Sequence, residues 1–214
     1  MNIKRFALGP LETNGYLVFD HQGNAVFIDP AAETLTVIDW IKKNNIELKA
    51  VLLTHGHIDH VAGLGESSFS DIIKGEIYLN SGDSEMVMYP PRGFAQSLGF
   101  NFDGISSLKD IKDGDELSFG DLRVKVISTP GHTEGSVCFL IKEENKEESA
   151  LFSGDTLFAQ GIGRTDLPGG DFYTLEKSLI KLASLAPELA VYPGHGPSTT
   201  ISDEMRKNPF WPRR

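Results

Sequence analysis

Thr54-His55-Gly56-His57-Ile58-Asp59-His60 follows directly after the apolar run 50–53. It places three imidazoles and one carboxylate within a few residues, in a chain that has 6 histidines among 214 residues. Imidazoles gathered this closely need a cation to offset their mutual crowding, and a solvated polar turn gives them no reason to cluster. The stretch therefore predicts a metal site, with a polar turn as the alternative.

The spacing of the first two histidines predicts the local backbone. Residues two apart do not share a face of a helix, so His55 and His57 reach one ion only from an extended or turning chain. The apolar run before them indicates a buried strand, and Gly56, Gly63 and Gly65 are expected to let the chain turn sharply beyond it. The motif is therefore predicted to be a loop at the carboxyl end of a strand, where layered α/β proteins bind ligands.

Three further candidate ligands also follow apolar, strand-like runs. They are His132, Asp155 and His195, and each stands beside a glycine. Any one of them alone would more often be a turn former or a capped side chain. Four strand ends that each deliver His or Asp beside glycine predict one shared site. The remaining histidine, His21, lies in the polar turn 20–24 and is predicted to be a surface residue.

Taken together, these motifs resemble the metallo-β-lactamase superfamily, and within it the glyoxalase II branch. The family's H-x-H-x-D-H, its later G-H-T, its G-D-T-L-F and its final G-H-G occur here in the family's order, over nearly the whole chain. The resemblance implies an α+β fold, the αββα four-layer sandwich, with the metals at one edge. It also implies a hydrolase that cleaves a thioester, such as S-lactoylglutathione, with a metal-bridging hydroxide.

The resemblance implies two divalent metals held by seven side chains. One metal would be bound by His55, His57 and His132 and the other by Asp59, His60 and His195, with Asp155 bridging them. Seven nitrogen and oxygen ligands are too many for one tetrahedral zinc, and the mixed set suits zinc first, with iron or manganese as alternatives. A structural zinc site is the other interpretation, but such sites are usually thiolate-rich, and this chain has 1 cysteine. That cysteine, Cys138, lies in an apolar run and is predicted to be core.

Two carboxylates are assigned roles in this chemistry. Two cations that share a water lower its pKa and polarise a carbonyl oxygen, so no side-chain nucleophile is required. As in the family, Asp59 is the catalytic residue expected to orient the hydroxide and take its proton. Asp29, at the end of the run 26–28, either orients a ligand imidazole or caps a turn before Pro30.

The expected substrate contact is Arg164, which resembles a basic residue that binds the glycine carboxylate of glutathione in the glyoxalase II branch. Asp166 and Pro197 stand where the family often has tyrosine. The chain is expected to be a single domain, 1–214, without the C-terminal helical domain that completes glutathione binding, and it resembles the short bacterial glyoxalase II-like proteins. The segment 89–94 is either a lid over the metals or a surface loop.

Other functions stay open at this stage. A mono-iron persulfide dioxygenase shares the histidine motif and a similar G-R-T-D stretch. Lactone or other ester hydrolysis is a second alternative. A protein that only stores metal would need the open coordination position to be blocked.

Composition narrows the partners and the location. The chain has 20 basic and 30 acidic residues, a net charge of −10, which argues against nucleic acid because phosphate binding needs a basic surface. At 40% hydrophobic it can bury a good core, yet it has no apolar stretch long enough to span a membrane. One cysteine and no export signal predict a cytoplasmic protein, and the expected partner is a small-molecule thioester.

Periodicity predicts some of the elements. Strands are expected at 16–19, 25–28, 124–127 and 137–141, and helices at 35–41 and 173–182. The charged run 142–148 is expected to be a solvated hairpin loop.

Overall fold

The computed structural model describes residues 1–91 and 93–212, and its first sheet has six strands. Neighbouring strands run antiparallel from β1 to β3 and parallel from β3 to β6. β2 and β3 are buried along almost their whole length because both faces of the sheet are covered. In spatial order the strands are β1 (Asn2–Leu8), β2 (Thr13–Phe19), β3 (Asn24–Ile28), β4 (Glu47–Leu52), β5 (Ile77–Leu79) and β6 (Lys109–Asp110).

The second sheet also has six strands and is mostly antiparallel, with β10 and β13 paired in parallel. The charged run 142–148 ends strand β9 and forms the turn to β10, and the antiparallel pairing of these strands confirms the predicted hairpin. Glu143, the last residue of β9, is buried and therefore not part of a solvated loop. The four predicted strands are confirmed within β2, β3, β8 and β9. In spatial order this sheet contains β14 (Thr199–Thr200), β13 (Ala190–Pro193), β10 (Ser149–Gly154), β9 (Val137–Glu143), β8 (Leu122–Ser128) and β7 (Glu116–Phe119); β11 (Leu157–Phe158) and β12 (Gly161–Ile162) form a separate small pair.

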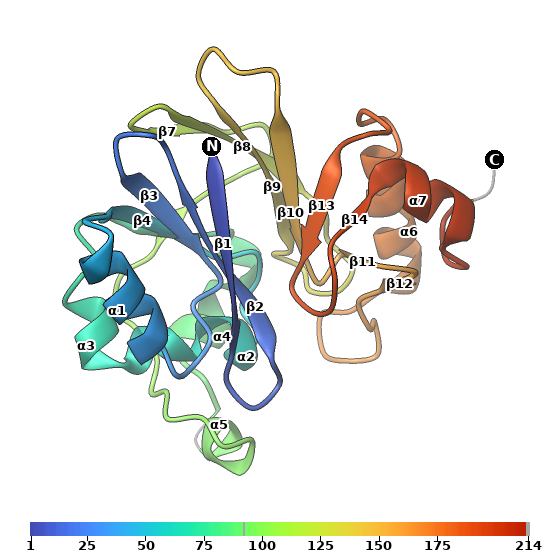
Figure 1. Cartoon of the computed structure of the whole chain (residues 1–214). Coiled ribbons are helices and arrows are strands. Elements are labelled where there is room, and N and C mark those ends of the chain that lie inside the picture. Colours follow the sequence, from blue (N-terminus) through green and yellow to red (C-terminus); the bar gives the residue numbers. More distant parts are fainter. Residues whose placement is uncertain (92, 213–214) are drawn as a thin grey trace.

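The two sheets pack face to face and form the middle two of four layers (Figure 1). Successive side chains of a strand point to opposite faces of its sheet, so each strand contributes to two cores. On β2, Val18 packs with Phe139 and Phe152 in a core between the sheets, whereas Leu17 packs on the opposite face in the core beneath α1. A third core, which contains Cys138, lies between the second sheet and the helices α6 and α7. The order helix, sheet, sheet, helix confirms the expected α+β αββα sandwich, and Cys138 is core as predicted.

The helices cover the outer faces of the two sheets (Figure 1). In α1 (Leu35–Lys43) the spacing of Val37, Ile38 and Ile41 puts one apolar face on the first sheet. The ring of Trp40 packs against Phe6 and Phe19. Both predicted helices are confirmed, the second as α6 (Phe172–Leu182). The others are α2 (Ile58–Val61), α3 (Ser67–Ser70), α4 (Ser84–Met88), α5 (Phe94–Ser97) and α7 (Ile201–Lys207), with short 3-10 turns η1 (Ala62–Gly65) and η2 (Ser81–Asp83).

Four strands deliver the candidate ligands to one edge of the sandwich. The loops that carry them follow the carboxyl ends of β4, β8, β10 and β13. No helix in residues 1–91 and 93–212 is long and apolar enough to cross a bilayer.

Candidate metal centre

The histidine motif is a loop in its first part and a helical turn in its second. His55 and His57 lie in irregular chain after β4, and the backbone of His57 is extended. Helix α2 begins at the next residue, so Asp59 and His60 lie on one helical turn. The prediction of a loop is therefore right for the first two histidines and wrong for Asp59 and His60.

The glycines of this region serve close packing, which the sequence did not indicate. Gly56, Gly63 and Gly65 are not among the glycines with positive φ. The prediction that they are needed for a sharp turn of the backbone is therefore wrong. A Cβ at Gly63 would lie 2.4 Å from the Ala31 carbonyl oxygen. Only a residue without a side chain fits at this position of η1, where the turn packs against the loop after β3.

Three imidazoles form the first cluster. His57 Nδ1 lies 3.2 Å from His55 Nε2 and 2.9 Å from His132 Nε2. Burial, followed by the neighbouring imidazoles, holds the pKa of His55 well below its usual value and lowers the pKa of His57 to about 4. All three residues can offer nitrogen atoms within 4.8 Å of one another. Because a metal binds the neutral imidazole, this cluster already favours the form that a ligand needs.

Asp59, His60 and His195 form the second cluster. Asp59 Oδ2 lies 3.2 Å from His195 Nε2 and 3.5 Å from His60 Nε2. Asp155 lies between the clusters, with Oδ1 3.3 Å from His60 Nε2 and Oδ2 3.6 Å from His132 Nε2. The structure thus brings all seven predicted ligands together and places Asp155 where it faces both groups of three.

Charge is distributed unequally over the two clusters. In the second cluster, burial raises the pKa of Asp59, but the neighbouring imidazoles of His60 and His195 lower it by more. The net effect holds the pKa of this carboxyl well below its usual range. The reverse holds for His60, where burial lowers the pKa but Asp155, Asp59 and Asp29 raise it well above its usual value. The second cluster therefore carries one ionised carboxylate, Asp59, that can neutralise part of the charge of a bound cation.

Two polar atoms test whether the residues fit a metal. His60 Nε2 and Asp155 Oδ1 are both buried, and neither makes a hydrogen bond within the described part of the chain, although they lie 3.3 Å apart. A buried polar atom without a partner destabilises the folded state by about 1–3 kcal/mol. A cation between these atoms would remove that cost, and imidazole and carboxylate donors suit zinc, iron or manganese. The residues present therefore fit divalent metals.

Groups outside the clusters hold the ligand imidazoles in place. Asp29 Oδ2 accepts hydrogen bonds from His60 Nδ1 at 2.9 Å and from the Thr54 hydroxyl at 2.6 Å, and Oδ1 accepts from the Thr54 amide at 2.8 Å. Of the two interpretations of Asp29, the structure favours the one that orients a ligand imidazole. His132 Nδ1 lies 2.7 Å from the backbone carbonyl oxygen of Arg164. Each contact leaves Nε2 of the ring facing the cluster.

Asp83 ties two ligand loops together, and the sequence interpretation missed it. This buried carboxylate accepts hydrogen bonds from the amides of Gly56 and Gly135, each at 2.8 Å, and from the Thr133 hydroxyl at 2.7 Å. Burial raises its pKa, and those three donors lower it less. Asp83 comes shortly after the apolar run 77–79, so the strand-end signal that found the ligands was also present here.

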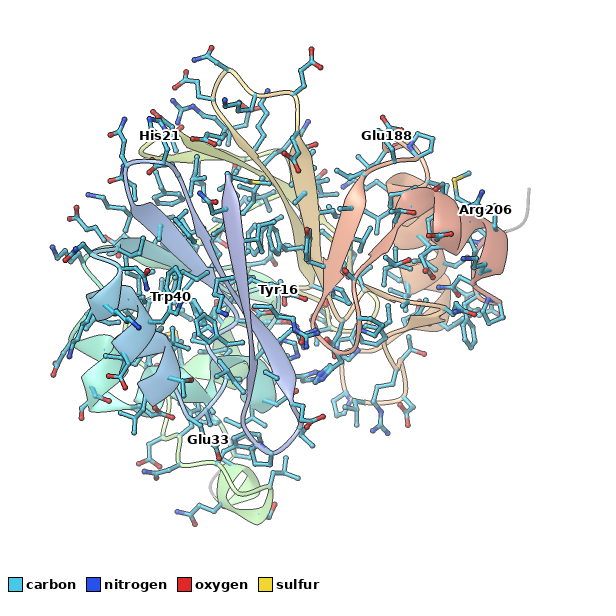
Figure 2. The ribbon with its side chains drawn as sticks, viewed as in Figure 1. Tyr16, His21, Glu33, Trp40, Glu188 and Arg206 are labelled. Atoms are coloured by element: carbon cyan, nitrogen blue, oxygen red, sulfur yellow. The ribbon has the colours of Figure 1, made fainter. Side chains whose placement is uncertain are left out.

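A second set of missed residues connects the two sheets. From β2, the Asn14 side-chain amide donates to the carbonyls of Pro193 and Gly196, both at 2.9 Å, and the Tyr16 hydroxyl donates to Pro193 at 2.7 Å. Figure 2 shows Tyr16 near the centre of the molecule. These contacts fix the loop that carries His195, and no short-range sequence signal could have indicated them.

Arg164 is exposed, and its guanidinium is paired. Its Nε and one terminal nitrogen donate to the two carboxylate oxygens of Asp166 at 2.7 and 2.8 Å. Substrate binding by Arg164 stays a prediction. In the segment 89–94, expected to be either a lid or a surface loop, Arg92 lies outside the described residues, and Tyr89 is exposed. His21, labelled in Figure 2, is exposed as predicted. Its Nδ1 lies 2.8 Å from Glu143 Oε1.

Comparison with known proteins agrees with this geometry. The family model of the metallo-beta-lactamase superfamily matches residues 8–195. Hydroxyacylglutathione hydrolase GloC of Haemophilus influenzae is 34% identical, over 98% of this chain and 97% of that protein. Two solved structures are similar over 99% of their own chains: BLEG-1 B3 metallo-beta-lactamase (TM-score 0.87, 34% identity, 98% of this chain) and TTHA1623 in a di-iron-bound form (TM-score 0.83, 36% identity, 97% of this chain). The chain therefore belongs to the metallo-β-lactamase superfamily.

Proposed function

We propose that this protein is a binuclear metal hydrolase of the glyoxalase II type, which cleaves a thioester such as S-lactoylglutathione. The observation that carries the proposal is the pair of adjacent three-residue clusters with Asp155 between them. Similarity to the hydrolase GloC along nearly its whole length supports the thioester over other substrates of the superfamily. A small-molecule substrate also agrees with the net charge of −10, which disfavours nucleic acid.

The proposal assigns a role to each group of residues. His55, His57 and His132 would hold one metal, and Asp59, His60 and His195 the second, with Asp155 shared. When bound, the metals supply Lewis-acid polarisation of the carbonyl and an activated water as nucleophile. Asp59 is held ionised by the imidazoles beside it, and its Oδ2 accepts a hydrogen bond from the Thr13 hydroxyl at 3.1 Å. The ionised carboxylate orients the attacking water and accepts its proton.

One observation favours a second function, a mono-iron persulfide dioxygenase. The cluster of His55, His57 and His132 is complete without the second group and provides three nitrogen ligands for a single ion. Lactone or other ester hydrolysis, including opening of a β-lactam as in the BLEG-1 enzyme, would use the same two-metal arrangement with a different substrate.

Metal content and reaction type separate these functions. Protein purified without added metal is analysed for zinc, iron and manganese, and assayed for hydrolysis of S-lactoylglutathione, a lactone and a β-lactam. The expected result is about two equivalents of metal and a preference for the thioester. Finding iron in place of zinc would not by itself distinguish the hydrolase from the dioxygenase, because the TTHA1623 structure is a di-iron-bound form. One iron with oxygen uptake on glutathione persulfide would overturn the hydrolase, and faster cleavage of the lactone or β-lactam would overturn the thioester.

A further inference from the structure

An apolar pocket opens directly beside the first cluster. Its volume is about 390 Å³, within the range of small-molecule sites. Four segments far apart in the sequence form its walls: the histidine motif with His57 and Ile58, α4 with Met86, the stretch that contributes Pro90, Pro91 and Ala95, and the loop with Leu167. The pocket is therefore assembled by the same fold that assembles the metal centre.

The described residues that line this pocket offer almost no polar groups. Of the described residues that line it, only His57 has a polar side chain; the others are glycine, proline, alanine, isoleucine, leucine and methionine. The Arg164 guanidinium is not part of the lining and is already paired with Asp166. A charged or strongly hydrated group placed here would lose its water without gaining a partner, whereas an apolar group would bind favourably.

The walls combine fixed and adaptable parts. Gly56 is held by Asp83, and a Cβ at Gly56 would lie 3.0 Å from Asp83 Cβ and 3.3 Å from Met86 Cβ. Ala95 is buried. Met86 is half-buried, and its unbranched thioether can adapt to ligands of different shape. The space is therefore preformed on one side and adjustable on the other.

We propose that this pocket binds an apolar chain next to the bond that is cleaved, so that preferred substrates carry a chain of several carbons on one side of that bond. The inference rests on the proposed thioester hydrolysis and names its substrate class. Continuity with the metal centre carries it, because the one residue His57 belongs both to the three-imidazole cluster and to the pocket wall. A carbonyl group placed at the cluster thus has this apolar space beside it.

Two series of thioesters test the proposal. The first keeps glutathione as the thiol and lengthens the acyl group from acetyl to octanoyl; the second keeps the acetyl group and lengthens an alkyl thiol. In one of the two series kcat/KM is expected to rise about fourfold for each buried CH₂ group and then level off when the pocket is full. The series that responds identifies the side of the substrate that enters the pocket.

A matched pair of variants assigns the effect to this pocket. Leu167→Asn introduces an amide into the wall and is expected to lower the ratio of kcat/KM between the longest and shortest substrates about tenfold. Leu35→Asn makes the same change at a leucine on α1 that is 65% exposed and is absent from the lining, so that ratio should not change. An equal response to both variants would overturn the assignment.

The outcomes distinguish this inference from the proposed function. If S-lactoylglutathione is cleaved well and neither series responds to chain length, the pocket proposal is wrong and the hydrolase stands. If no thioester is cleaved, the hydrolase proposal is wrong. Whether the pocket binds apolar chains is then tested by calorimetry on metal-loaded protein, with straight-chain carboxylates from acetate to octanoate as ligands. Affinity that rises with length and falls in Leu167→Asn supports the pocket, and affinity independent of length overturns it.

Discussion

Replacing Asp83 by asparagine tests whether this carboxylate holds the two ligand loops together. In the structure one carboxylate oxygen accepts from the Gly56 amide and the Thr133 hydroxyl, and the other accepts from the Gly135 amide. Asparagine keeps a single acceptor oxygen and places an NH₂ group where the second acceptor was. At least one backbone N–H would then face another donor in a buried site.

The expected destabilisation follows from that change. Losing one hydrogen bond and burying an unsatisfied donor destabilises the folded state by about 2–3 kcal/mol. The loss of a buried carboxylate offsets part of this, because burial raises the pKa of Asp83 and so disfavours its ionised form in the folded protein. We therefore expect a decrease of about 2 kcal/mol in the free energy of unfolding, or about 4–8 °C in Tm for a chain of this size.

Metal binding should respond as well. Gly56 lies between His55 and His57, and Thr133 follows His132, so the contact to Asp83 fixes the relative position of the three imidazoles. Loss of such outer support typically lowers metal affinity about 10–100-fold. Zinc affinity is measured by competition with a chromophoric chelator, and stability by urea and thermal unfolding of the metal-free protein.

The control is Asp110→Asn, an exposed carboxylate beside the same turn that accepts a single hydrogen bond, from the Ser81 amide at 2.9 Å. It should change stability by less than about 1 kcal/mol and leave metal affinity unchanged. Asp83→Asn with unchanged Tm and unchanged affinity would refute the reasoning. Lower stability with wild-type metal affinity would show that Asp83 supports the fold but does not position the ligands.

Three other predictions concern the carboxylates of Asp59 and Asp20 and the guanidinium of Arg164. Asp59→Asn should keep the fold and lower turnover of a thioester by about 10²–10⁴, and near wild-type activity would contradict the role assigned to Asp59. Arg164→Ala should raise KM for S-lactoylglutathione about tenfold and leave KM for a neutral thioester nearly unchanged; an equal effect on both would mean that Arg164 supports its loop through the pair with Asp166. At Asp20, burial raises the pKa, but hydrogen bonds from Asp121 and Asn24 lower it by more, so the folded-state pKa lies below the ordinary value. The ionised carboxylate therefore stabilises the folded state above about pH 4, and this stabilisation is lost as the pH falls through the folded-state pKa. In metal-free protein, Asp20→Asn should therefore be less stable than wild type by about 2 kcal/mol at pH 7 and by much less near pH 3, whereas the exposed control Asp39→Asn should show no such difference; a gap independent of pH would contradict the assignment.

The sequence could indicate the candidate ligands because the signal for each is local. His132, Asp155 and His195 each follow a strand-like run, and strand ends on one side of a sandwich meet at one edge. The strand predicted at 16–19 is likewise a local signal, but β2 is apolar on both faces, so its sequence does not say that Leu17 faces the helices and Val18 the other sheet. Periodicity alone did not predict the four-layer arrangement, which came from the resemblance to the family.

The supporting residues could not be predicted because their partners are far along the chain. The Asn14 amide bonds to the Pro193 carbonyl across 179 positions, and Asp83 joins Gly56 to Gly135. Gly63 is needed because Ala31 approaches it, a contact that exists only after the layers have packed. Such requirements depend on tertiary packing and leave no periodic pattern in the sequence.

Each cluster of ligands draws on both sheets, and this determines when the protein can acquire metal. His55 and His57 need His132, and Asp59 and His60 need His195. The first two residues of each cluster follow strand β4 of the first sheet, whereas His132 and His195 follow strands of the second, so neither cluster is complete until the two sheets have folded against each other. Metal binding therefore follows the docking of the two sheets, and ions bound across the seam would also secure one sheet to the other.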